Sequence, residues 1–214
     1  MDYYNRGLYN TFRLDVDLVP ALKFPESRWP VGKQYRDIPY ECKRDYWMVV
    51  PKPNKSGNTV QDEHRSWRIA LQDQEKQLLY NTYALRQTIC LIKKLRDSLG
   101  MKKIASYYIK TIFFWEIIEL KRTDPWFWQK KDIDTLFTYA VKKFYAALER
   151  GEIKYFWNPQ LNLIANLGQS TLYEYKNKIR NVIEVLEQPN RQLRAVAKFL
   201  LTNEEYMEYN KFLS

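Results

Sequence analysis

Asp17, near the start of the chain, is the residue whose type and surroundings best suit it to chemistry. It lies in residues 12–23, where apolar side chains alternate with Asp15 and Asp17, and the pair Trp29-Pro30 follows. Such alternation is typical of a strand with one buried face, and a carboxylate on that face is costly unless a cation meets it. A divalent metal ion is one such cation. The simpler alternative is an edge strand whose acids face water.

The elements that would position Asp17 change in character near residue 62. Before it, prolines and the turn at residues 54–58 divide the chain into strands and loops. After it, apolar residues recur at helical spacing, with Gly100 and Gly151 as suitable stops. This spacing predicts helices over residues 78–99, 112–120, 133–148, 170–187, 190–201 and 203–212. The expected fold class is therefore α+β, with strands first and a mainly helical lobe after them.

The balance of charge favours a polyanionic partner. The chain of 214 residues has a formal net charge of +10, and the basic surplus lies within residues 1–180, while the tail is near neutral. Such a surplus attracts nucleic acid first of all. The alternative is that each basic pair only solvates a helix face.

Other residue types exclude several classes of protein. His64 is the only histidine and Cys42 and Cys90 are the only cysteines, so we expect no structural zinc and two free thiols. Lys110 interrupts the best apolar run, residues 104–120, so we expect no membrane span and no membrane partner. Since the first residues carry no apolar signal core, we expect an intracellular, cytoplasmic protein.

Five segments, in order, resemble the male-abnormal-21 family of nucleotidyltransferases, which includes cyclic GMP–AMP synthase and the insect cGAS-like receptors. Residues 12–23 with Trp29-Pro30 are similar to the family's third metal-binding strand. The other four segments are residues 46–52, 66–79, 106–111 and 155–163. The resemblance implies three parts: the C-terminal portion of the nucleotidyltransferase core sheet, a helical nucleotide- and nucleic-acid-binding lobe, and a helical tail without a counterpart. Their ranges are 1–61, 62–165 and 166–214.

This resemblance implies an enzyme that, in complete form, uses Mg²⁺ or Mn²⁺ to make a cyclic dinucleotide of the cyclic GMP–AMP type. Its substrates would be ATP and GTP, its activator double-stranded RNA, and its role innate antiviral signalling. Family enzymes place a Gly-Ser loop and an acidic pair before the third metal strand, so that three carboxylates hold two metals. Here Gly7 has no following serine and no acidic pair precedes Asp15. We therefore expect the C-terminal part of an enzyme, inactive alone.

The resemblance also assigns roles to single residues. On the GTP side it implies Asp17, which is also the catalytic metal ligand, together with Arg68 and Glu75. On the ATP side it implies Glu75, Lys93, Ser106, Tyr107 and Lys110. Simpler readings remain: a surface arginine for Arg68, a favourable helix-dipole contact for Glu75 and a core tyrosine for Tyr107. Ala70 and Gln72 stand where the family often has serines, which leaves base selectivity open.

The nucleic-acid candidates are basic residues on the predicted helices. They are Arg86, Lys94, Lys102, Lys103, Lys130 and Lys131. Vertebrate cyclic GMP–AMP synthase inserts a zinc loop where residues 79–85 pass straight through, so the closer resemblance is to the insect receptors. Double-stranded RNA is bound by shape through its phosphates, which suits scattered lysines and arginines, and a homodimer on nucleic acid would fit. The alternatives are a non-catalytic adaptor or developmental protein of the family, and a basic RNA-binding helical domain.

Overall fold

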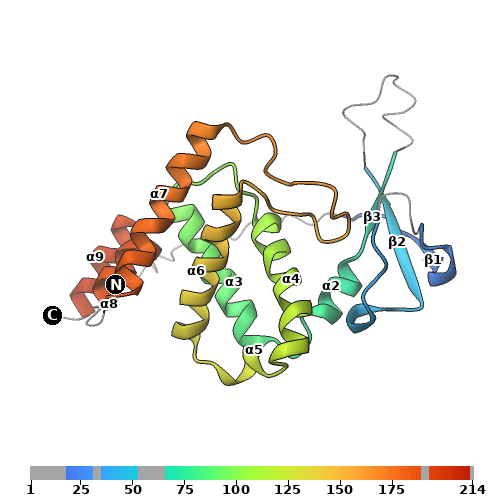
Figure 1. Ribbon diagram of the computed structural model, residues 1–214, viewed down its shortest axis with the longest axis horizontal. Helices are drawn as coiled ribbons and strands as arrows, with labels where there is room; N and C mark the ends of the chain where they lie inside the picture. The colour runs from blue at the N-terminus through green and yellow to red at the C-terminus, as the bar shows by residue number, and fades with distance from the viewer. Residues whose placement is uncertain (1–17, 31–34, 53–65, 189–192, 213–214) are drawn as a thin grey trace, which may run out of the picture. The chain divides into compact units, whose positions relative to one another are not determined.

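The computed structural model describes residues 18–30, 35–52, 66–188 and 193–212. Asp17 and Asp15 lie outside these residues. The chain divides into two compact units (Figure 1), which we call the sheet unit, residues 1–29 and 45–71, and the helical unit, residues 30–44 and 72–214. Strands and helices are thus segregated along the chain, and the predicted α+β class is confirmed.

The sheet unit contains three antiparallel strands in the order β1-β2-β3. Their bounds are Leu22–Pro25 for β1, Tyr46–Pro51 for β2 and Trp67–Ala70 for β3. Trp47 of β2 forms the centre: its ring stacks on Phe24 at 4.9 Å and meets Trp29 edge-on at 5.4 Å. The indole N–H of Trp47 also donates to the carbonyl of Pro25. A buried tryptophan with a satisfied N–H contributes a large apolar area to a small sheet.

The predicted strand over residues 12–23 is confirmed at Leu22 and Lys23 but is wrong at residues 18–21. Residues 18–21 have no regular structure, and β1 begins only at Leu22. Leu18 is 91% exposed, so the alternating pattern does not mark a buried face there. Alternation predicts a strand only where a neighbouring strand is available to pair, and β2 pairs from Leu22 onward.

The helical unit begins with a short 3₁₀ segment, Tyr40–Cys42, and continues with eight described helices. They are α2 Gln72–Leu78, α3 Tyr83–Ser98, α4 Ser106–Thr123, α5 Phe127–Lys130, α6 Ile133–Arg150, α7 Gln169–Leu186, α8 Leu193–Leu200 and α9 Asn203–Phe212. The single apolar stripe predicted over residues 78–99 is broken between α2 and α3. Asn81 has φ of +59° there, a left-handed conformation that asparagine tolerates and that ends a helix.

The core of the helical unit lies around α6, which packs against α3 and α7 and more sparingly against α4 (Figure 1). Leu136, Ala140 and Phe144, spaced four residues apart, are fully buried. Asp132 caps the start of α6 by accepting from the backbone N–H of Thr135 at 2.8 Å.

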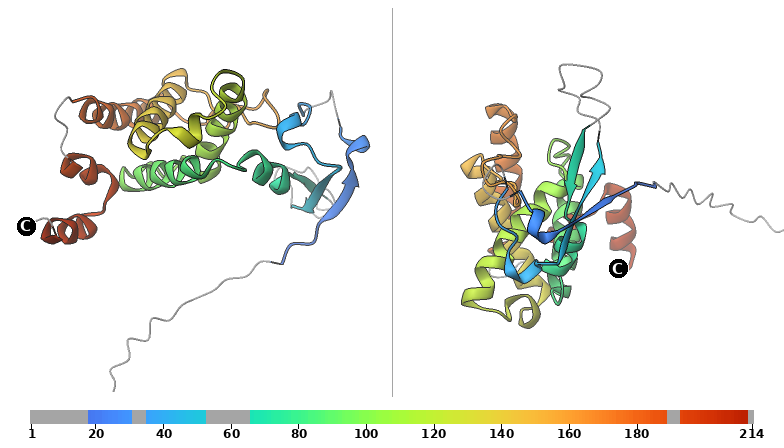
Figure 2. Two further views of the ribbon diagram at one scale, coloured as in Figure 1. Left: turned by 90° about the horizontal axis from the view of Figure 1, so that it is seen from below. Right: turned by 90° about the vertical axis from the view of Figure 1, so that its right-hand side faces the viewer.

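The last two helices continue this packing along α3. Helix α8 contacts both α3 and α7, and α9 follows it (Figure 2). Lys94 of α3 binds both carboxylate oxygens of Glu205 on α9 at 2.6 Å, and the hydroxyl of Ser98 donates to the carbonyl of Phe199. The tail is thus helical, as predicted. No helix among the described residues has the length and apolarity needed to cross a membrane.

Candidate functional site

The centre of the candidate site is a buried carboxylate, that of Glu75 on α2. Its side chain is only 10% exposed. The hydroxyl of Tyr107 donates to Oε1 at 2.8 Å, and the indole N–H of Trp157 donates to the same oxygen at 3.2 Å. Lys110 binds Oε2 at 2.7 Å. A buried carboxylate is tolerated only when donors and a counter-charge replace its water, and these three groups do so.

Local structure explains why these donors meet. Tyr107 and Lys110 lie three residues apart in the first turns of α4, so both side chains lie on one face of the helix. Trp157 arrives from the segment after α6 and is 1% exposed. Its carbonyl accepts from the backbone N–H of Arg36 at 3.1 Å, and its ring meets Phe156 edge-on at 4.8 Å. The network therefore ties three separate segments to α2.

The segment that carries Trp157 is itself organised by Asn162. The amide oxygen of Asn162 accepts from the backbone N–H groups of Ile153 and Ile164, at 3.0 and 3.1 Å. Its amide nitrogen donates to the carbonyl of Gly151 at 2.9 Å. One side chain thus closes the loop after α6, which fixes the position of Trp157.

Tyr107 acts in this site as a neutral donor. Burial, and then the neighbouring Glu75 carboxylate, raises the pKa of Tyr107 far above its usual value. The ring is half-buried and lies 6.0 Å from that of Tyr155 at an angle of 56°. Its hydroxyl is therefore engaged with the protein, and only the ring is left to contact a ligand.

The start of α4 adds a second group of polar atoms. Ser106 is the first residue of α4 and is exposed, and Arg96 donates to its Oγ at 3.0 Å and to the carbonyl of Ile104 at 3.0 Å. Free backbone N–H groups at a helix start favour an anion, whereas the charge of Arg96 is already paired with Asp97 at 2.6 Å. Lys93, on α3, is half-exposed and has no ion pair with a described residue. These groups have the chemistry to hold phosphate oxygens.

The structure therefore brings together Glu75, Tyr107 and Lys110 of the predicted nucleotide residues, with Ser106 at the start of the same helix. Arg68 lies on β3, in the other unit, and is exposed. The sequence did not predict Trp157 at this site, and it marked Arg96 only as a basic residue that could contact nucleic acid. No local signal points to Trp157, because Trp157 and Glu75 are 82 residues apart in the chain.

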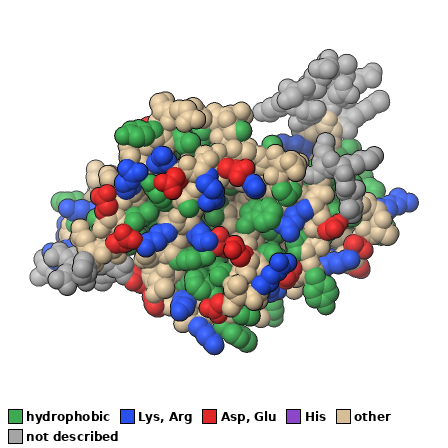
Figure 3. All heavy atoms as spheres, in the orientation of Figure 1, with side chains coloured by type: hydrophobic (Ala, Val, Ile, Leu, Met, Phe, Trp, Pro, Cys, Tyr) green, Lys and Arg blue, Asp and Glu red, His purple; other side chains and the backbone are tan. Residues whose placement is uncertain are grey.

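The predicted nucleic-acid residues differ in how free their charges are. Lys94 is neutralised by Glu205 at 2.6 Å. Arg86 donates to the carbonyl of Leu79, and Lys103 makes a long contact with the hydroxyl of Thr171 at 3.4 Å. The other three candidates, all exposed, are Lys102, Lys130 and Lys131. On the face in Figure 3, basic and acidic side chains alternate over the helices and do not form one basic patch.

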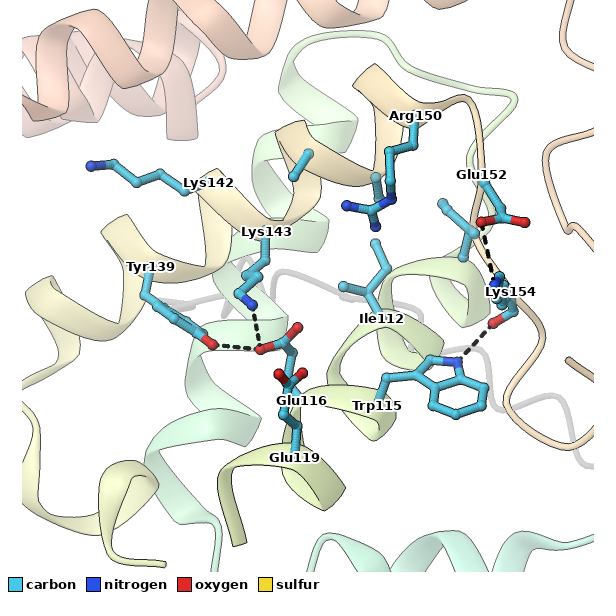
Figure 4. A pocket seen from close by; sticks show the side chains of 13 residues that line it. Ile112, Trp115, Glu116, Glu119, Tyr139, Lys142, Lys143, Arg150, Glu152 and Lys154 are labelled. Carbon is cyan, nitrogen blue, oxygen red and sulfur yellow. Dashed lines mark hydrogen bonds and ion pairs between the residues drawn. The ribbon is translucent and has the colours of Figure 1, made fainter. Parts of the chain in front are cut away.

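A separate groove lies between α4 and α6, with a volume of about 730 Å³ (Figure 4). Within it, Glu116 accepts from the hydroxyl of Tyr139 and binds Lys143 at 2.9 Å. Burial, and then this hydrogen bond, raises the pKa of Tyr139. No residue predicted to bind nucleotides lines the groove. Since most of its charges are neutralised in pairs, the groove shows no strong preference for an anion or a cation.

The described residues do not by themselves form a metal site. Across residues 18–30, 35–52, 66–188 and 193–212, no group of three or more His, Cys, Asp or Glu side chains could hold a metal ion. The predicted metal ligand, Asp17, lies outside these ranges. Its role therefore stays a prediction.

Comparison with known proteins identifies the family. Residues 7–81 match the model of the Mab-21 protein nucleotidyltransferase domain, and residues 84–181 match the Mab-21 protein HhH/H2TH-like domain. The chain belongs to the Mab-21 family. Glu75 lies in the region that matches the nucleotidyltransferase domain, and Tyr107 lies in the region that matches the HhH/H2TH-like domain. The buried network therefore connects the two matched regions.

Several relatives within the Mab-21 family are similar over most of the chain. A cyclic GMP-AMP synthase-like receptor of Aethina tumida is 33% identical over 198 residues, which is 92% of this chain and 47% of the relative. Receptors of the same name from Ctenocephalides felis and Tribolium castaneum are 32% and 35% identical, and cover 93% and 92% of this chain. The alignment takes in 46% of each of these two receptors. The chain thus spans about half the length of the relatives it matches.

Proposed function

We propose that this Mab-21 chain supplies one metal-binding carboxylate, Asp17, and the ATP-side contacts of a cGAS-like receptor. In complete form the receptor would make a cyclic dinucleotide of the cyclic GMP–AMP type from ATP and GTP. The observation that carries the proposal is the buried network in which Tyr107 and Lys110 bind Glu75. Three residues predicted for one nucleotide meet at one place, although α2 and α4 are distant in the chain.

The residues of the network would have different roles in binding ATP. Glu75 positions other residues, because Trp157, Tyr107 and Lys110 already occupy its carboxylate. With its hydroxyl held, the Tyr107 ring keeps one orientation, and a fixed aromatic ring stacks on a base at little cost in entropy. Ser106 with Arg96, and Lys93, would contact phosphate oxygens.

The remaining parts of the proposal concern the metal and the activator. Asp17 would hold Mg²⁺ or Mn²⁺, which in such enzymes polarises the attacking hydroxyl and neutralises the leaving pyrophosphate. One carboxylate cannot hold two metals, so this chain alone should be inactive. Double-stranded RNA would be the activator and a homodimer on RNA the assembly, in cytoplasmic antiviral signalling.

ATP binding by the full chain tests the proposal. Tyr107→Ala should weaken ATP binding by about tenfold, because loss of one base-stacking ring costs roughly 1–3 kcal/mol. Tyr107→Phe keeps the ring but loses its hydrogen bond to Glu75, so it should bind ATP more weakly than the wild type and more tightly than Tyr107→Ala. Tyr173→Ala, which removes a 64% exposed tyrosine of α7, is the matched control. Calorimetric titration would measure all four proteins, and equal affinities for wild type and Tyr107→Ala would contradict the nucleotide site.

A non-catalytic Mab-21 adaptor is the second candidate. It is favoured by the Glu75 network, in which Tyr107, Lys110 and Trp157 satisfy the buried carboxylate without a ligand. The two candidates differ in ATP binding at Tyr107, which an adaptor does not require. Incubating the chain with ATP, GTP, Mn²⁺ and double-stranded RNA should yield no cyclic product in either case, and a product would show that it is active alone.

A further inference from the structure

An aromatic hollow lies away from the Glu75 network, where the turn between α2 and α3 meets the connection from α4 to α5. It has a volume of about 570 Å³, which is within the range of small-ligand sites. We call it the aromatic hollow. Its principal lining residues are Asn81, Tyr83, Gln87, Trp126, Trp128 and Gln129. A smaller hollow of about 270 Å³ adjoins it and shares Asn81, Trp126, Trp128 and Gln129.

Large aromatic rings are exposed around this hollow. Tyr83 is 71% exposed and Trp126 54%, and Tyr80, which is 63% exposed, lines the smaller adjoining hollow. The turn that carries Tyr80 is held in place, because Asn81 adopts a positive φ and its carbonyl accepts from Gln129 at 3.1 Å. Exposed rings gathered on a fixed surface indicate a binding site more often than scattered ones do.

Cations accompany the rings. The guanidinium of Arg86 lies 5.8 Å from the centre of the Tyr83 ring, and the ammonium of Lys130 lies 5.7 Å from that of Trp126. Neither cation has an ion pair with a described residue. The acids near this surface, Glu41 and Asp124, line only the smaller hollow, where Lys121 lies with them. The rim of the aromatic hollow is therefore complementary to an anion.

The walls also offer hydrogen bonds. Asn81, Gln87 and Gln129 bring amide side chains, each of which can both donate and accept. Trp128 is 5% exposed, and its indole N–H has no acceptor within the described part of the chain. This nitrogen is itself inaccessible, so Trp128 supplies an apolar wall, and the hydrogen bonds open to a ligand come from the amide side chains.

We propose that the aromatic hollow binds an unpaired nucleobase of single-stranded nucleic acid, with Trp126 and Tyr83 stacking on the base and Arg86 and Lys130 contacting the flanking phosphates. Rings that accept a base face, amides that match base edges and cations for phosphates together fit this ligand class. The inference goes beyond the proposed function, because its ligand is single-stranded. It rests neither on the binding of duplex RNA nor on nucleotide synthesis.

Two probes of equal length and charge distinguish binding through the bases from binding through the phosphates. One is a single-stranded oligoadenylate, and the other is an abasic oligomer with the same number of phosphates. The full chain should bind the oligoadenylate about tenfold more tightly at the same salt concentration. In Trp126→Ala this ratio should fall towards one, while the affinity for the abasic oligomer stays unchanged. Trp126→Phe should keep most of the preference, and Tyr173→Ala is the matched control for an exposed ring elsewhere.

Equal affinity of wild type for both probes would overturn the inference, as would a preference that survives in both Trp126→Ala and Tyr83→Ala. Self-association of the free chain that Trp126→Ala abolishes would assign the surface to a second copy instead. A blunt RNA duplex, measured in parallel, tests the proposed activator separately. Duplex binding without a base preference overturns only this inference, and a base preference without duplex binding overturns only the activator.

Discussion

Among single residues, Lys110 supplies the counter-charge that makes the burial of the Glu75 carboxylate tolerable. Lys110→Met should lower the free energy of unfolding by about 2–3 kcal/mol, because it leaves a buried carboxylate without a counter-charge. Urea denaturation would measure this. Lys76→Met is the control, since Lys76 is 77% exposed and its pair with Asp73 is worth well under about 1 kcal/mol. Similar losses in both variants would contradict a structural role for the buried pair.

The two free cysteines should differ sharply in reactivity. Burial, with Glu41 adding to it, raises the pKa of Cys42 to about 12 from 9.0, whereas Cys90 is exposed. Because the folded state favours the protonated thiol, this contribution to stability is present below pH 9 and is lost as pH rises towards 12. At about pH 8, iodoacetamide should therefore modify Cys90 and spare Cys42 in the native chain. Mass spectrometry checks this, and equal labelling in urea is the control.

At the scale of elements, the end of α6 is sensitive to a single methyl group. Gly151 has φ of +65°, and a Cβ there would lie 3.3 Å from Leu172. Gly151→Ala should cost about 1–2 kcal/mol, because L-residues are strained in the left-handed region. Gly168 has φ of −63° and nothing within 4 Å of its would-be Cβ, so Gly168→Ala should be close to neutral. Thermal unfolding compares the two, and equal midpoints would refute this account of the α6 cap.

At the scale of the whole molecule, the net charge of +10 should give salt-dependent binding to double-stranded RNA. The double variant Lys102→Glu, Lys103→Glu should weaken binding for all sequences and reduce the salt slope by about two, at roughly one per phosphate contact. Lys94→Gln should change the slope little, because Glu205 already neutralises that charge. Fluorescence anisotropy across a salt series tests this. A slope that is the same in all three proteins would mean that these lysines only solvate helix faces.

Periodic apolar residues and helix stops are local signals, and from them the α+β class and the main helices could be predicted. The family followed from the resemblance of five segments. The apolar stripe over Leu85, Ile89 and Ile92 predicted the buried face of α3 correctly. It failed between α2 and α3, where the backbone at Asn81 ends the first helix. The strand predicted over residues 12–23 failed at residues 18–21, since the described pairing of β1 with β2 starts at Leu22.

Which charges are free and which residues share a site became visible only in the folded chain. The resemblance pointed to Glu75 and Tyr107 separately, but the sequence could not show that Trp157 completes their network, because that contact joins residues far apart in the chain. Likewise Lys94 and Lys102 are both basic helical residues in the sequence, yet Glu205 neutralises the first. Local patterns fix elements, whereas the packing of distant segments sets the burial and the partners on which the chemistry of a charged or polar group depends.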